Sequence, residues 1–213
     1  GTVLILDYDN EKVKHINNKL LNRVKAYLTD ITDRKQIITS IKKIYNKYNN
    51  IDILINNAGL NMIDKFENIN ENNFNKVLDT NLKGTFFCTQ EVVKYMKLNN
   101  CGKIINISSQ AGITGQPYMS SYCAAKFGII GMTQALALEL GKYNITVNAI
   151  CPGMVVTERT QEIAKALSKK GVSIEKFIQE DKKKVIATTP LGKIAMPNDI
   201  AQIAAFLASS ESN

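Results

Sequence analysis

Apolar residues along the chain fall into two alternating kinds of stretch. Short continuous apolar runs predict strands that are covered on both faces, at 2–7, 24–29, 51–56, 103–109 and 145–151. Between these runs apolar residues recur every three or four positions, which predicts helices over 10–22, 33–48, 71–98, 120–142 and 197–209. This alternation is typical of βαβ units, so we predict one α/β domain over residues 1–213 with a doubly wound parallel sheet.

The composition fits one soluble domain. Of the 213 residues, 45% are hydrophobic and 22% are charged, which suffices for a single core. No stretch reaches the ~18–20 apolar residues of a membrane span, and no leader pattern is seen, so we expect a cytoplasmic protein without a membrane partner. The four cysteines form no CxxC pair, and we predict buried, reduced thiols and no metal site.

The net charge of +8 raises the question of a nucleic-acid partner. Most of the excess is lysine, and it is spread thinly along the chain. The one run, Lys182–Lys184, is typical of a solvated helix face. We therefore expect no nucleic-acid binding, while an acidic or phosphorylated protein partner stays open. A Ser-His-Asp hydrolase would need a histidine near Ser109, but the single histidine, His15, lies on the first predicted helix and is expected at the surface.

Small and polar residues follow three of the predicted strands. Ligands of open parallel sheets bind outside the carboxyl ends of the strands, so these positions are the first candidates for a site. They are Asn57, Ala58 and Gly59 after the strand 51–56, Ser109 at the end of 103–109, and Pro152, Gly153 and Thr157 after 145–151. Each of them alone is an ordinary loop residue, and only their combination indicates a binding edge.

Tyr122 and Lys126 are the sharpest candidates for chemistry. Four residues apart at the start of a predicted helix, they share one face, and an ammonium beside a phenol favours the phenolate, which predicts an acid/base group. One such pair is expected by chance, and Tyr8 with Lys12 forms a second. We assign the chemistry to Tyr122 because Ser109, a strand-end hydroxyl, precedes it across a glycine-containing loop.

Four motifs together carry a resemblance to a known family. They are NNAG at 56–59, Asn81 within DTNLKG, the NISS to SSYCAAK block ending at Lys126, and PGMVVT at 152–157. In this order and spacing the chain resembles the short-chain dehydrogenase/reductase family along its whole length. The resemblance implies a Rossmann-type domain that moves hydride between a nicotinamide cofactor and a secondary alcohol or ketone. It also implies four catalytic residues: Ser109, Tyr122, Lys126 and Asn81.

The same resemblance implies a cofactor site. Asp7, at the end of the first strand of the chain, matches the acid that binds the adenosine ribose and repels a 2′-phosphate, which favours NAD over NADP. Asp30 matches a position that meets the adenine amino group, although it also fits a residue beside a helix start. The remaining cofactor-binding residues would be Asn57, Ala58, Gly59, Tyr122, Lys126, Pro152, Gly153 and Thr157.

The substrate is the least determined feature. The segment 157–190 is long and polar and is interpreted either as a substrate lid or as a surface insertion. Its length and Asp7 favour a small polyol or hydroxyketone, with a 3-oxoacyl-[acyl-carrier-protein] reductase as the alternative. A non-catalytic nucleotide-binding relative is the alternative of another class. Gln110, Gln116 and Tyr118 are the candidate substrate residues.

Two expectations concern assembly and extent. Helices 71–98 and 120–142 are expected to build a homo-oligomer, a tetramer by the resemblance, because the second carries Gly128, Gly131, Ala135 and Ala137. The resemblance further implies that the first βα unit, with its glycine-rich turn, and the last strand of the family fold lie outside this sequence. The facing edges of strands 2–7 and 51–56 are then expected to be unpaired.

Overall fold

The computed structural model describes residues 1–19, 23–155, 157, 179, 183, 185–187 and 189–213. It contains five strands, every pairing of which is parallel: β1 (Val3–Asp7), β2 (Val24–Leu28), β3 (Ile53–Asn56), β4 (Gly102–Ile107) and β5 (Ile145–Ile150). All five predicted strands are therefore confirmed, with ends that differ from the predicted ones by up to two residues. Most of the expected lid, 157–190, lies outside the described residues, as do Lys182 and Lys184 of the lysine run.

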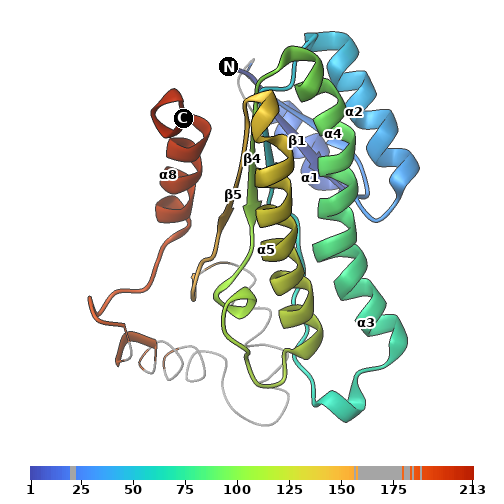
Figure 1. Cartoon of the computed structure of the whole chain (residues 1–213). Coiled ribbons are helices and arrows are strands. Elements are labelled where there is room, and N and C mark those ends of the chain that lie inside the picture. The colour runs from blue at the N-terminus through green and yellow to red at the C-terminus, as the bar shows by residue number, and fades with distance from the viewer. Residues whose placement is uncertain (20–22, 156, 158–178, 180–182, 184, 188) are drawn as a thin grey trace.

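Helices cover the strands from both sides, as a doubly wound sheet requires. They are α1 (Asn10–Lys19), α2 (Arg34–Tyr48), α3 (Glu71–Leu78), α4 (Thr85–Asn99), α5 (Ser120–Leu140) and α8 (Pro197–Ala208). In Figure 1, α4 and α5 lie on one face of β4 and β5, and α8 lies on the other. The predicted α/β class and its five helical stretches are confirmed.

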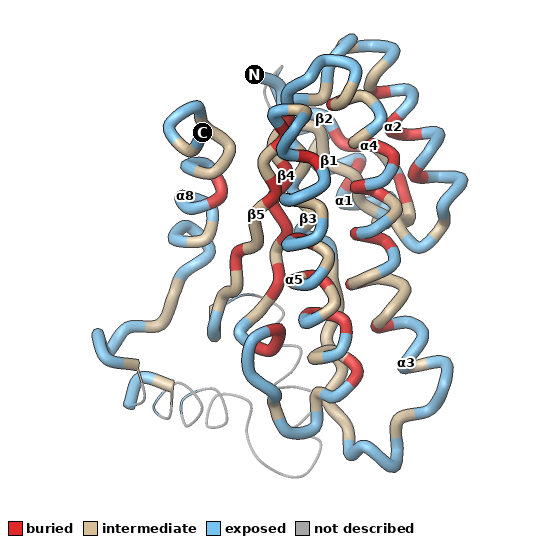
Figure 2. The backbone as a smooth tube through the Cα atoms, in the orientation of Figure 1, coloured by how far each residue is buried: buried red, intermediate tan, exposed pale blue. Residues whose placement is uncertain are grey.

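Strand β4 shows why the strands are apolar without alternation. Its residue Ile104 packs into a core cluster that includes Ile41, Met96 and Leu140 from the helices on one face. The next residue, Ile105, packs with Ala204 of α8 on the opposite face. Both isoleucines are fully buried, because successive side chains of a strand point to opposite faces and here both faces are covered. Figure 2 shows buried backbone along β4.

The strands form two separate parts. Strands β1 and β2 pair with each other, and β3, β4 and β5 form a second sheet in that order. Within the described residues no ladder joins β1 to β3, as the sequence led us to expect. Val3 of β1 and Ile53 and Ile55 of β3 are exposed, in contrast to the buried isoleucines of β4. Apolar surface on unpaired strands favours aggregation.

Three details differ from the sequence predictions. The strand expected to run to residue 109 ends at Ile107, so Ser109 lies beyond the ladder. The helix expected over 71–98 is interrupted by a π-helical turn, η2 (Asp79–Gly84), which divides it into α3 and α4. The cysteines are all free, but only Cys88 is buried, whereas Cys101 is exposed. Burial raises the pKa of the Cys88 thiol to about 12, which makes it a poor nucleophile.

Helix α5 is the central helix of the domain. Together with the short turn that follows it, residues 120–143 are long and apolar enough to cross a membrane by length and composition alone, which the sequence analysis did not anticipate. In the fold its buried face includes Lys126, Ile129 and Thr133, and the helix packs against β5. The helix thus belongs to the packed domain, with polar side chains on its inner face.

Candidate active site

The loops that follow β3, β4 and β5 lie together at the carboxyl ends of these strands, at the lower end of the molecule in Figure 1. After β4 the chain forms a 3-10 turn, η3 (Gln110–Gly112), with Ser109 as its N-cap. The Ser109 hydroxyl accepts a hydrogen bond from the amide of Ala111 at 3.1 Å. The amide of Gln110 donates to the carbonyl of Pro152 at 2.8 Å, which ties the loop after β4 to the loop after β5.

Tyr122 and Lys126 lie on the first two turns of α5, next to η3. The Lys126 ammonium lies 5.6 Å from the centroid of the Tyr122 ring. Lys126 is only 4% exposed, and its Nζ donates to the carbonyl of Ile107 at 2.8 Å, so the buried charge is partnered. In the second pair, by contrast, Tyr8 and Lys12 are both exposed at the start of α1.

Asn81 is fully buried in the π-helical turn. Its Nδ2 donates to the carbonyls of Leu60 and Val77 at 2.7 and 2.9 Å, and its Oδ1 accepts from the amide of Leu60 at 3.2 Å. A widened helical turn leaves backbone carbonyls without their usual partners, and an amide side chain can satisfy them. Asn81 therefore joins the helix to the loop that follows β3.

At Gly59 the loop after β3 comes close to the π-helical turn and to α5. A Cβ at this position would lie 2.6 Å from Oδ1 of Asn81 and 3.7 Å from Nζ of Lys126. Only glycine permits this approach. The loop after β3, the π-helical turn and α5 consequently meet at one point, which places Asn81 and Lys126 on either side of Gly59.

The remaining cofactor candidates lie on the same edge or on the β1–β2 sheet. Asn57, Ala58, Gly153 and Thr157 are exposed, and Pro152 is half-buried. Asp7 ends β1, and its Oδ1 accepts from the amide of Asp9 at 2.9 Å. In Asp30, Oδ1 accepts from the amide and hydroxyl of Thr32, both at 2.8 Å, so this carboxylate supports the turn before α2, whose N-cap is Asp33.

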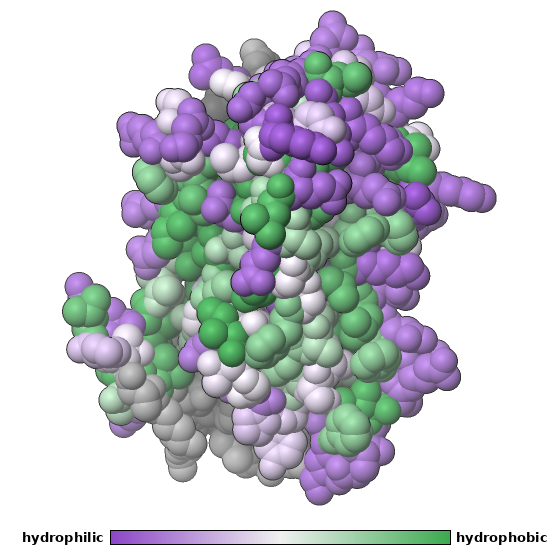
Figure 3. Space-filling model, viewed as in Figure 1, coloured by the Kyte–Doolittle hydropathy of each residue, from purple (hydrophilic) through white to green (hydrophobic). Residues whose placement is uncertain are grey.

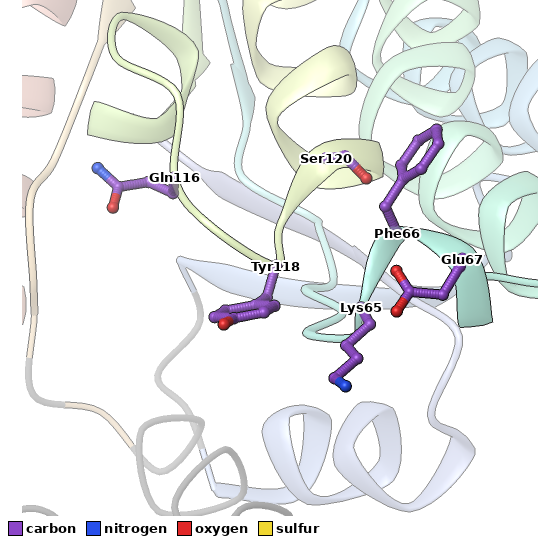
Figure 4. A pocket seen from close by; sticks show the side chains of 6 residues that line it. All are labelled: Lys65, Phe66, Glu67, Gln116, Tyr118 and Ser120. Atoms are coloured by element: carbon purple, nitrogen blue, oxygen red, sulfur yellow. The ribbon is translucent and has the colours of Figure 1, made fainter.

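A cavity of about 370 Å³ opens beside the start of α5 (Figure 4). It is lined by Lys65, Phe66, Glu67, Gln116, Tyr118 and Ser120. Two of the three predicted substrate residues, Gln116 and Tyr118, are among them, and Gln110 is not. Tyr118 has a φ of 64°, an unusual value for a residue with a side chain, and its carbonyl accepts from the amide of Asp64 at 2.9 Å.

Lys65, Phe66 and Glu67 were not singled out from the sequence. They open a short 3-10 turn, η1 (Phe66–Asn68), in a polar connection that carries no motif. The one available signal was Phe66, a large apolar residue in a polar loop, which is 79% exposed. Among the described residues no cluster of His, Cys, Asp and Glu could hold a metal ion.

Both the sequence and the structure of the chain were compared with those of known proteins, and the two comparisons agree on one family. A family model described as short chain dehydrogenase matches residues 1–168. The 3-oxoacyl-[acyl-carrier-protein] reductase FabG of Thermotoga maritima is 36% identical to the chain over 100% of its length and 82% of the relative. A (2S)-[(R)-hydroxy(phenyl)methyl]succinyl-CoA dehydrogenase subunit, BbsD of Thauera aromatica, is 34% identical over 100% of the chain and 81% of the relative.

Two solved structures share the fold. "ElxO with NADP Bound" superposes with a TM-score of 0.85 at 32% identity, over 99% of this chain and 82% of that one. "Crystal Structure of NAD+-Bound Xylitol Dehydrogenase" superposes with a TM-score of 0.87 at 27% identity, over 99% and 84%. With the match of the family model over residues 1–168, these likenesses establish that the chain belongs to the short chain dehydrogenase family of oxidoreductases, which act on CH-OH groups.

Proposed function

We propose that this protein reduces the 3-oxo group of an acyl chain carried as a thioester, with a nicotinamide cofactor. The observation that carries the proposal is the similarity over essentially the whole chain to FabG reductases at 31–36% identity and to a CoA-linked dehydrogenase at 34%. The substrates in the names of these relatives all carry a secondary alcohol or a ketone on an acyl group. Acyl-carrier protein and CoA both hold the acyl group as a thioester, so the two kinds of substrate are chemically alike near the reacting carbon.

The chemistry assigns a role to each of four side chains. When hydride is delivered to the carbonyl carbon, negative charge develops on its oxygen, and hydrogen-bond donors held there lower the barrier. Ser109 and Tyr122 are those donors, and Tyr122 also gives its proton to the oxygen. Lys126, buried and close to the Tyr122 ring, places a positive charge beside the group that donates the proton. Asn81 supports the helix turn and the loop beside them.

The cofactor supplies the hydride when it is bound. Gly59, which packs against Asn81 and lies close to Lys126, is among the residues that would hold it. Asn57, Ala58, Pro152, Gly153 and Thr157 are the further residues that would hold it, together with Tyr122, Lys126, Asp7 and Asp30.

A substrate panel tests this proposal. We expect reduction of acetoacetyl-CoA with NADH to be faster, by kcat/KM, than reduction of acetoin or oxidation of xylitol. The rates are read from the absorbance of the nicotinamide at 340 nm. Turnover of acetoin or xylitol with none of acetoacetyl-CoA would overturn the thioester proposal. Cofactor binding without turnover of any of the three would favour the non-catalytic alternative.

A small polyol or hydroxyketone, which the sequence analysis favoured, is the second candidate. The likeness to the xylitol dehydrogenase structure, with a TM-score of 0.87, is the observation in its favour. Its identity of 27% is lower than that of the FabG relatives, and for this reason it is placed second. In the panel it predicts xylitol oxidation with NAD as the dominant activity.

We further propose that NAD is preferred to NADP, because the Asp7 carboxylate at the end of β1 would repel a 2′-phosphate. Removing this charge by Asp7→Ser is expected to lower the ratio of kcat/KM with NADH to that with NADPH about tenfold. Asp52→Ser, which removes an exposed carboxylate before β3, is the control and should leave the ratio unchanged. A wild-type preference for NADPH would contradict the assignment.

We also propose a homotetramer built on α4 and α5. Figure 3 shows apolar residues gathered over these two helices, and Phe127, Leu138 and Phe86 are exposed there. Gly131 has no atom within 4 Å of the position of a Cβ, so this part of the face is open to a neighbour. Gly128, by contrast, contacts Leu82 within the chain.

Leu138→Glu is expected to dissociate the tetramer, because it places a charge at the centre of an apolar interface. Light scattering at micromolar concentration should give four times the chain mass for the wild type and a smaller mass for the variant. Tyr8→Glu, at an exposed aromatic residue between β1 and α1, is the control. A monomeric wild type would contradict the proposal.

A further inference from the structure

We propose that Ser108 is a positioning residue for the reaction, because its buried hydroxyl binds the backbone of Lys126 and fixes the lysine ammonium beside Tyr122. The inference rests on Tyr122 and Lys126 carrying the oxidoreductase chemistry, and it does not depend on which carbonyl compound is reduced.

Ser108 is the residue between β4 and the N-cap Ser109. Its amide donates to the carbonyl of Ile150 at 2.8 Å, which extends the pairing with β5 by one residue. Its side chain is 4% exposed and points to α5, where Oγ donates to the backbone carbonyl of Lys126 at 3.0 Å. A buried hydroxyl with a defined partner holds two elements in one relative position.

A second hydrogen bond runs in the opposite direction. The side chain of Lys126 donates from Nζ to the carbonyl of Ile107, the residue before Ser108, at 2.8 Å. The side chain of Ser108 therefore binds the backbone of α5 at Lys126, and the side chain of Lys126 binds the backbone at the end of β4. We call this reciprocal pair of bonds the Ser108–Lys126 clasp. A lysine has four rotatable side-chain bonds, and the clasp fixes both its backbone and its terminal nitrogen.

Gly112 packs directly against the Ser108–Lys126 clasp. A Cβ at this position would lie 2.5 Å from Oγ of Ser108 and 2.7 Å from the carbonyl oxygen of Lys126. The turn η3 can lie directly over these atoms only because residue 112 is a glycine. Three residues thus form the clasp and the packing around it: Ser108, Gly112 and Lys126.

The clasp connects the proposed catalytic groups. Ser109 follows Ser108 directly, and Tyr122 lies one turn before Lys126 on α5. The position of the Ser109 hydroxyl relative to the Tyr122 hydroxyl therefore depends on how the end of β4 meets the start of α5. An error of about 1 Å in such a geometry can reduce a rate by up to a hundredfold.

Ser108→Ala tests the clasp, with Thr133→Val as the matched control. Thr133 is also a buried hydroxyl on α5 that donates to a helix carbonyl, that of Ile129 at 2.7 Å, and it accepts from Asn106 of β4 at 2.9 Å. It lies two turns beyond Lys126, away from the loops. Ser108→Ala loses one buried side-chain hydrogen bond and Thr133→Val loses two, so both variants are expected to lower Tm by a few degrees, with Thr133→Val at least as destabilised.

Only Ser108→Ala is expected to affect the chemical step. Its kcat should fall about tenfold with KM for the carbonyl substrate within about twofold of the wild type, and Thr133→Val should keep kcat within about twofold. The assay uses NADH with the compound of the panel (acetoacetyl-CoA, acetoin or xylitol with NAD) that the wild type converts fastest. An unchanged kcat in Ser108→Ala, or an equal loss in Thr133→Val, would overturn the proposal.

Hydrogen–deuterium exchange provides a readout that needs no substrate. In Ser108→Ala the amides of residues 107–112 and 122–126 should exchange faster than in the wild type, whereas in Thr133→Val the faster exchange should lie around residue 133. Unaltered exchange at 107–112 would overturn the clasp. If no panel compound is converted, the failure lies with the proposed function, and the exchange measurement still decides for or against the clasp.

Discussion

Tyr122→Phe is expected to lower kcat about 10³-fold while the protein stays folded and binds the cofactor. The substitution removes only the hydroxyl, which in the proposed mechanism stabilises the developing oxyanion and delivers the proton. The ring that lies 5.6 Å from the Lys126 ammonium remains in place, so packing is preserved. Turnover is measured with NADH and acetoacetyl-CoA, and binding by the fluorescence of the reduced nicotinamide.

Tyr8→Phe is the matched control for this experiment. Tyr8 and Lys12 have the same spacing as Tyr122 and Lys126, but Tyr8 is 78% exposed and lies outside the loops after β3, β4 and β5. We expect its kcat to equal that of the wild type. Residual activity of Tyr122→Phe above a tenth of the wild-type rate would show that another group donates the proton.

Asn81→Ala is expected to destabilise the protein by about 2–4 kcal/mol, because it leaves three backbone groups of a buried turn without partners. For a chain of this size the loss corresponds to a decrease in Tm of about 5–15 °C. The π-helical turn would also lose its link to the loop that carries Gly59, so kcat should fall about tenfold or more. Thermal unfolding and steady-state kinetics measure the two effects.

Asn75→Ala is the control on the same stretch of helix. Asn75 is an exposed residue of α3, and its replacement by alanine should leave Tm within about 2 °C of the wild type. A Tm for Asn81→Ala as high as that of the control would mean that the amide is dispensable for the turn. The structural role described above would then be wrong.

The order of elements could be read from the sequence because local pattern and tertiary environment agree. The continuous apolar run KIINI is buried on both faces in β4, and the periodic isoleucines of 33–48 form the inner face of α2. Where the prediction failed, backbone hydrogen bonding decided the outcome. The pattern at 103–109 gave no sign that β4 ends at Ile107, with only the amide of Ser108 still bound to β5, because Ser108 and Ser109 are compatible with a strand.

Candidate residues for the site could be chosen from the sequence, but their contacts could not. Ser109, Tyr122, Lys126 and Asn81 were chosen by motif, and the two Tyr/Lys pairs were separated only by their neighbours in sequence. The partners of these residues are main-chain atoms, namely the carbonyl of Ile107 for Lys126 and both polar atoms of Leu60 for Asn81. Every residue has these backbone groups, so no sequence pattern marks them. The lining residues Lys65, Phe66 and Glu67 were missed for a similar reason, since the loop that brings them to Tyr118 has no periodicity.

The sequence by itself determined the α/β class, the order of strands and helices, and the chemical types of the residues at the carboxyl edge of the strands. These features follow from hydrophobic period and from local motifs, which act over a few residues. Only the tertiary structure decided the π-helical turn at Asn81 and the reciprocal bonds between Ser108 and Lys126. These features depend on hydrogen bonds between atoms that are distant in sequence. The separation of two residues along the chain does not show whether their atoms come within hydrogen-bond distance in the fold.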